Sequence, residues 1–179
     1  MTITVRNPRT GEIDYSIEAV PPEEIVGIAT RLRKAQPEWQ TLGADGRAAV
    51  LLQWAGALQA NGEAIVDKLR TDTGRLALAK VELVSVIGIL QRWAANGPGI
   101  IAGLDINNVQ SANPTVKISN RHIPYPLFGA IAPWNFPLLL ALIDAIPALM
   151  AGCAALIKPS EVTPRFISEL RKTIEAVPA

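Results

Sequence analysis

The segment IAPWNFP, residues 131–137, places one amide side chain, Asn135, at the entrance to a long apolar stretch. An uncharged amide can donate a hydrogen bond to an oxyanion that develops during a reaction, without bringing a titrating proton of its own. An asparagine shortly before Pro137 is also a common N-cap at the start of a helix. The residues alone favour the capping interpretation and leave the oxyanion interpretation open.

A second group of polar side chains follows the apolar run CAALIKP, where Lys158 and Glu161 stand close together in the sequence. In a doubly wound α/β fold, the end of the second strand commonly holds the adenosine ribose of a dinucleotide, with an acidic side chain on its hydroxyls. A carboxylate there favours NAD over NADP, although the neighbouring lysine blurs the choice. A solvated ion pair explains the residues equally well, and no G-x-G-x-x-G loop supports a dinucleotide.

The elements that position these residues alternate from residue 127 onward. We expect a strand at about 127–132, a helix from 137 to about 151, a strand over CAALIKP and a helix from about Pro164. This order predicts a parallel sheet with crossover helices, the start of a Rossmann-like, doubly wound α/β domain. Two strands have little to close their core against, so we expect the domain to be cut short or completed by something else.

The preceding part of the chain predicts a hairpin and several helices. Thr10-Gly11 supplies the tight turn of the hairpin. Helices are expected from the PPEEI segment to near Trp39, from an N-cap at Asp45, from Glu63 to about Arg70, and from Leu76 to a stop signal at Asn96-Gly97-Pro98. A further strand is expected at about 115–122, before the proline-rich HIPYP.

Composition excludes several classes of function. The 17 basic and 16 acidic residues give a net charge of +1, which offers no reason to expect nucleic acid as a partner. Residues 137–157 are apolar enough to test as a membrane span, but Asp144 and Pro147 argue against one. One cysteine, Cys153, fits a reducing cytoplasm, and with only His122 beside it no Cys/His zinc site can form, so we expect no metal.

Two blocks of the sequence together resemble the NAD(P)-dependent aldehyde dehydrogenase superfamily. They are the Pro-Trp-Asn-Phe-Pro block and the Lys-Pro-Ser-Glu block, in register between Gly129 and Pro164. The resemblance implies the amino-terminal part of such an enzyme, an incomplete fold whose catalytic domain is absent. It divides the chain into a hairpin and helical part (1–114), an oligomerisation-type strand segment (115–126) and two strand–helix units of the NAD-binding domain (127–179).

The resemblance also implies roles for individual residues. Asn135 matches the catalytic amide that donates to the oxyanion. The expected cofactor-binding residues are Ile131, Pro133 and Trp134 on the nicotinamide side and Lys158, Ser160 and Glu161 at the adenosine ribose. Phe136, Leu140 and Ile143 match a helix face that borders the aldehyde tunnel, and their apolar character suggests a hydrophobic aldehyde. Plain helix core explains these three equally well.

The family's chemistry needs groups that this chain does not contain. Its members use a cysteine thiolate that attacks the aldehyde, then hydride transfer to the nicotinamide and hydrolysis. Cys153 lies in AGCAALIK, an apolar setting that favours a buried, inert thiol, and the matching nucleophile and general-base glutamate would lie beyond residue 179. We therefore expect an NAD- or NADP-dependent oxidoreductase when complete, a homo-oligomer, and no activity from these residues alone. The alternative is an inactive relative that acts as an assembly or interaction module through residues 115–123.

Overall fold

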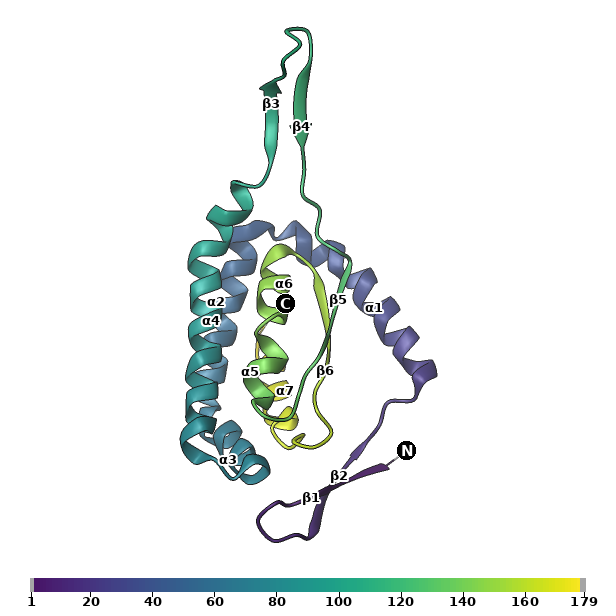
Figure 1. Ribbon diagram of the computed structural model, residues 1–179, viewed down its shortest axis with the longest axis vertical. Coiled ribbons are helices and arrows are strands. Elements are labelled where there is room, and N and C mark those ends of the chain that lie inside the picture. The colour runs from purple at the N-terminus through teal and green to yellow at the C-terminus, as the bar shows by residue number, and fades with distance from the viewer. Residues whose placement is uncertain (1, 178–179) are drawn as a thin grey trace.

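The described part of the chain, residues 2–177 of a computed structural model, contains seven helices and three two-stranded sheets. Figure 1 shows a helical body with a hairpin at each end. The strands are β1 (Thr2–Arg6), β2 (Ile13–Glu18), β3 (Ile106–Gln110), β4 (Lys117–Asn120), β5 (Leu127–Ile131) and β6 (Ala154–Lys158). The helices are α1 (Pro22–Thr41), α2 (Gly43–Ala60), α3 (Gly62–Thr73), α4 (Leu76–Ala102), α5 (Pro137–Leu142), α6 (Ala145–Ala151) and α7 (Ile167–Glu175).

The predicted parallel sheet is present. Strands β5 and β6 pair in parallel, with Ile131 opposite Lys158, and the N–H of Ala132 donates to the Lys158 carbonyl at 3.0 Å. The crossover between them is a pair of short helices, α5 and α6, in place of the one continuous helix expected. Pro147 explains the break, because its ring and missing N–H are incompatible with a helical carbonyl at Ile143, four residues earlier.

The amino-terminal hairpin is also present, with β1 and β2 antiparallel. Gly11 adopts a φ of +76° in its turn, the left-handed conformation that a glycine accommodates without strain. Its N–H donates to the Asn7 carbonyl at 2.8 Å and closes the loop. The Thr-Gly signal therefore predicted this turn correctly.

Two predicted helix boundaries are wrong. Helix α4 does not stop at Asn96-Gly97-Pro98 but continues to Ala102, because Gly97 is buried against Met150 of α6 and this packing outweighs the local stop signal. Asp45 is not an N-cap, since α2 already begins at Gly43 and no side chain caps it. Both errors arise where tertiary packing overrides local preference.

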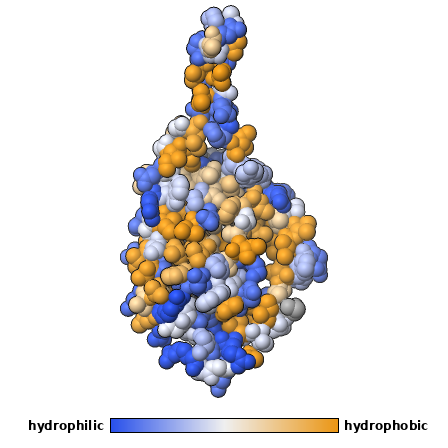
Figure 2. Space-filling model, in the orientation of Figure 1, coloured by the Kyte–Doolittle hydropathy of each residue, from blue (hydrophilic) through white to orange (hydrophobic). Residues whose placement is uncertain are grey.

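A second hairpin projects from the body at the top of Figure 1 and consists of β3 and β4. The expected strand at 115–122 corresponds to β4, but its partner β3 was not predicted, since INNVQ is mostly polar. Every residue of both strands is exposed, including Ile106, Val109 and Ile118. In Figure 2 apolar residues accordingly appear along this projecting stalk.

The core lies between the long helices and the α5–α6 crossover. Its fully buried side chains include Leu51, Leu58, Leu90, Leu138 and Ile146, from α2, α4, α5 and α6. The apolar segment 137–157 thus forms two short helices and a strand. Across residues 2–177, no helix is both long and apolar enough to cross a membrane.

Candidate active site

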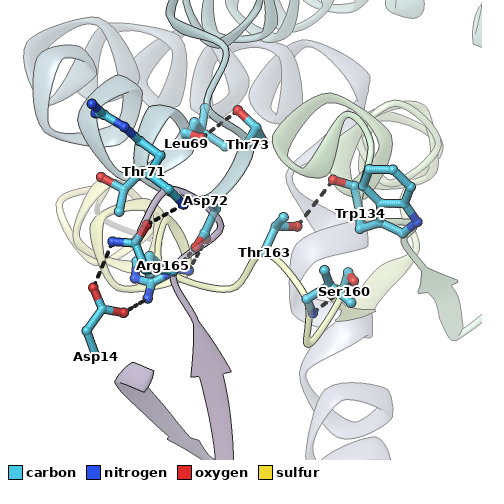
Figure 3. A network of polar contacts seen from close by, with 12 residues as sticks. Asp14, Leu69, Thr71, Asp72, Thr73, Trp134, Ser160, Thr163 and Arg165 are labelled. Atoms are coloured by element: carbon cyan, nitrogen blue, oxygen red, sulfur yellow. Dashed lines mark hydrogen bonds and ion pairs between the residues drawn. The ribbon is translucent and has the colours of Figure 1, made fainter. Parts of the chain in front are cut away.

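The carboxyl ends of β5 and β6 bring two loops together at one edge of the sheet. The first loop, residues 132–136, follows β5, and the second, residues 159–166, follows β6. The buried Thr163 hydroxyl donates to the Trp134 carbonyl at 3.4 Å and joins the two loops, as Figure 3 shows. The two sequence motifs therefore share one edge, as the parallel register requires.

The side chain of Asn135 is exposed and does not cap the helix that follows it. The N-cap position of α5 belongs to Phe136, and no side chain of the adjoining loop bonds the first turn. The capping interpretation of Asn135 is therefore wrong. The amide is left free to hydrogen-bond a group outside the chain.

A buried carboxylate from α4 takes the place of the missing cap. The Glu82 Oε2 atom accepts hydrogen bonds from the N–H groups of Leu138 and Leu139, at 3.0 and 3.1 Å. Glu82 is 1% exposed, and burial raises the pKa of its carboxyl above the ordinary value, while the two N–H groups and the charge of Arg75 oppose that shift. No local pattern could predict this contact, since Glu82 is 56 residues from Leu138.

Arg75, at the start of α4, contacts the same loop. Its guanidinium donates to the Asn135 carbonyl and lies 5.2 Å from the centre of the Phe136 ring. A guanidinium over an aromatic face is an attractive arrangement. The main chain around Asn135 is thus held by two side chains of α4.

At the end of β6, Lys158 and Glu161 form an ion pair. The Lys158 Nζ and Glu161 Oε2 atoms are 2.6 Å apart, and the two side chains are 60% and 52% exposed. The hydrogen bond from Lys158 lowers the pKa of the Glu161 carboxyl. Ser160 between them is buried, and its hydroxyl accepts a bond from the Val162 N–H at 3.2 Å. Of the three expected ribose contacts, Lys158 and Glu161 therefore face solvent, and Ser160 stabilises the loop from inside.

An arginine in this second loop anchors it to the rest of the body. The Arg165 guanidinium bonds the carboxylates of Asp72, at the end of α3, and Asp14, in β2 (Figure 3). The Arg165 N–H also donates to Asp72 Oδ2 at 2.9 Å. Burial raises the pKa of the Asp72 carboxyl, and the bonds from Arg165 oppose that shift. Sequence reasoning missed this network, because Asp72 and Arg165 are 93 residues apart.

The remaining expected site residues lie around the same edge or on the helix beyond it. Ile131 and Trp134 are exposed by 83% and 58%, and Pro133 between them is also exposed. Phe136 and Leu140 are half-buried on the α5 side. The structure thus brings the nicotinamide-side candidates to the surface at the end of β5.

Ile143 lies instead in a groove of about 560 Å³ between α4 and α6. Its apolar lining consists of Ile89, Trp93 and Ile100 of α4, Pro147 of α6 and Ile143 between α5 and α6, and its charged groups are Arg92 and Asp144. Phe136 and Leu140 are not part of its lining. The three expected tunnel residues therefore do not line one cavity.

Cys153 is buried, 6% exposed, and immediately precedes β6. Burial raises the pKa of its thiol, so little thiolate exists at neutral pH. The structure thus gives Cys153 the inert surroundings that its sequence context predicted. Within residues 2–177, no group of three or more His, Cys, Asp or Glu side chains could hold a metal ion.

Known proteins match this chain throughout. A profile of the aldehyde dehydrogenase family matches residues 1–179. Glutarate-semialdehyde dehydrogenase of Pseudomonas putida is 32% identical over 164 residues, which are 91% of this chain and 33% of that protein. The chain therefore spans about a third of the length of the curated relatives it matches.

Solved structures agree in fold. PutA of Anabaena variabilis superposes with a TM-score of 0.94 at 42% identity, over 99% of this chain and 37% of that one. An NADP-dependent enzyme of E. coli gives a TM-score of 0.89 at 27% identity, over 100% and 37%. An NAD-dependent benzaldehyde dehydrogenase of Corynebacterium glutamicum gives 0.88 at 28% identity, over 100% and 39%. Relatives of this chain thus use NAD or NADP.

Proposed function

Since the chain belongs to the aldehyde dehydrogenase family, we propose that it forms part of an enzyme that oxidises an aldehyde to a carboxylic acid with NAD, or with NADP. One observation carries the proposal. Two loops from neighbouring parallel strands meet through the Thr163–Trp134 hydrogen bond, and the Asn135 amide next to that contact is exposed and does not cap α5. An edge of this kind is where doubly wound folds bind nucleotides.

In this proposal Asn135 is the oxyanion donor. Attack on an aldehyde carbonyl places negative charge on its oxygen, and an amide N–H fixed nearby stabilises that charge without reorganising. The cofactor supplies the hydride acceptor when it is bound. The residues that would hold it are Ile131, Pro133 and Trp134 on one loop and Lys158, Ser160 and Glu161 on the other.

The second loop is suited to an adenosine ribose. The exposed Glu161 carboxylate can accept hydrogen bonds from vicinal hydroxyls, and its pKa, lowered by Lys158, keeps it ionised at neutral pH. Lys158 neutralises that charge in part, so a 2′-phosphate is not strongly repelled. We therefore propose NAD as the cofactor, with NADP as the alternative.

For the substrate we propose a hydrophobic aldehyde. Phe136, Leu140 and Ile143 are apolar, and the groove beside Ile143 has mostly apolar walls. The nearest acidic group, Asp144, would repel a carboxylate on the substrate, although Arg92 in the same groove carries the opposite charge. Comparing turnover of an uncharged aldehyde such as benzaldehyde with that of an ω-carboxylated one tests this choice.

Catalysis also requires a nucleophile and a general base, and Cys153 does not supply the first. We propose that residues 1–179 alone do not reduce NAD when an aldehyde is added. Absorbance of NADH would reveal any turnover, and turnover that survives Cys153→Ala would contradict the proposal. In the complete enzyme, Asn135→Ala should lower kcat by about 10²–10³. An unchanged kcat would remove Asn135 from the reaction.

Assembly is a separate part of the proposal. We propose a cytoplasmic homo-oligomer in which the β3–β4 hairpin, segment 115–126 included, contacts another copy, since its exposed strands carry apolar side chains. Such edges tend to seek a partner strand. The alternative, an inactive relative that serves only as an assembly module, predicts the same oligomer but no effect of Asn135→Ala. Light scattering measures the oligomeric state, and a monomer would contradict the proposed homo-oligomer.

A further inference from the structure

Two side chains at the start of α4 hold the loop that carries Asn135. We propose that Glu82 and Arg75 are positioning residues, which fix the main chain at Asn135 and in the residues that follow it, and so set the direction of its amide. The inference rests on the proposed oxyanion role of Asn135. Neither residue belongs to the two motifs from which that role was predicted.

The geometry places both residues on the same side of one helix. Arg75 occupies the N-cap position of α4 and Glu82 lies seven residues later, which is two helical turns. Helix α4 is itself anchored in the core, where Val86 and Leu90 are fully buried. Its first turns therefore offer a rigid support for a loop distant in sequence.

The contacts hold the main chain at Asn135 and shortly after it, and none of them involves the Asn135 side chain. Arg75 donates to the carbonyl of Asn135, and Glu82 accepts from the N–H groups of Leu138 and Leu139. Only Phe136 and Pro137 lie between. The Arg75 guanidinium carbon lies 5.2 Å from the centre of the Phe136 ring, over its face. Pro137 has a fixed φ.

Glu82 is also the group on which the first turn of α5 depends. Phe136 at the N-cap has no side-chain acceptor, and Pro137 at the first position has no N–H. Without the Glu82 carboxylate, the N–H groups of Leu138 and Leu139 would lose the acceptor that holds them. The start of α5, and with it the exit of the chain from Asn135, would then become mobile, and a donor must be fixed to stabilise an oxyanion well.

The test is nuclear magnetic resonance on the ¹⁵N-labelled 179-residue chain, with the Asn135 side-chain signals assigned through Asn135→Ala. In Glu82→Ala we expect the Asn135 side-chain NH₂ signals to move, and the N–H groups of Leu138 and Leu139 to exchange about tenfold faster, as the loss of a buried acceptor implies. Glu82→Gln keeps an acceptor oxygen and should restore both properties.

Two further variants keep the test decisive. Glu63→Ala removes an exposed glutamate in the first turn of α3 and should change neither property. Arg75→Ala alters a half-buried position and should move the Asn135 signals even where Glu82→Ala does not fold. Unchanged Asn135 signals in folded Glu82→Ala and in Arg75→Ala would overturn the proposal.

A kinetic comparison separates this proposal from the function on which it rests. In the complete enzyme, Glu82→Ala should lower kcat. It should lower kcat little further when Asn135 is already alanine, because both changes remove the same stabilisation of the oxyanion. An Asn135→Ala enzyme with normal kcat would contradict the oxyanion role of Asn135. The nuclear magnetic resonance measurements would then decide by themselves whether Glu82 and Arg75 position the Asn135 amide. Full additivity of the two losses would contradict the positioning itself.

Discussion

Replacing Arg165 by methionine tests whether its ion pairs hold the loop after β6 in place. The Arg165 and Asp72 side chains are 6% and 0% exposed, so the substitution leaves a carboxylate buried without its counter-charge. Removing one partner of a buried pair costs about 3–5 kcal/mol. We expect a loss near about 3 kcal/mol, at the lower end of that range, because the main-chain N–H at position 165 still donates to Asp72.

The assay is urea denaturation of the 179-residue chain at neutral pH, followed by circular dichroism. The double variant Arg165→Met/Asp72→Asn also removes the buried charge, so it should unfold at a higher urea concentration than Arg165→Met alone. Asp14→Asn affects the more exposed arm of the network and should have the smallest effect. A free energy of unfolding for Arg165→Met within about 1 kcal/mol of the parent chain would refute the reasoning, since surface ion pairs contribute no more than that.

Three further predictions concern packing, reactivity and pH. Gly97→Ala should destabilise the chain by about 1–3 kcal/mol in the same assay, because the new Cβ would lie 2.5 Å from the Cγ atom of buried Met150. Gly88→Ala, on the same helix, meets nothing within 4 Å and should stabilise the chain by up to about 1 kcal/mol. Equal changes in unfolding free energy for the two variants would contradict the contact with Met150. Cys153 should react with a thiol reagent about two orders of magnitude more slowly in the folded chain than in urea, and equal rates would contradict its burial. The pKa of Glu82 is raised from 4.5, so its contribution to stability is fully present below pH 4.5 and is lost as the pH rises through the folded-state pKa. Denaturation at several pH values should therefore show the parent chain losing stability relative to Glu82→Gln as the pH rises above 4.5. A difference in unfolding free energy between the two chains that stays constant with pH would contradict the shift.

The order of elements around the site could be predicted because local patterns determine it. Alternating apolar runs, separated by Gly and Pro residues, predicted β5, the crossover and β6. The parallel pairing of the two strands then brings the loops that follow them to one edge of the sheet. Even the break between α5 and α6 could have been found, since Pro147 stands four residues after Ile143. The strand β3 carried no such pattern and was missed.

What holds the loops in place could not be predicted, because the contacts join residues far apart in sequence. Glu82 is 56 residues from Leu138, and Asp72 is 93 residues from Arg165. The charged side chains of Glu82, Asp72 and Arg165 are equally compatible with an exposed surface, and only the tertiary structure shows that all three are buried. The same reasoning explains Asn135, which local preference identified as a cap until Glu82 was seen to serve the first turn of α5 in its place.

The central claim is that the loops after β5 and β6 together form one side of a nucleotide site. The most direct measurement is a titration of the ¹⁵N-labelled chain with NAD, followed residue by residue. The account predicts that signals of residues 131–135 and of residues 158–163 move together along one binding curve. Signals that move in only one loop, or at a surface remote from both, would contradict it.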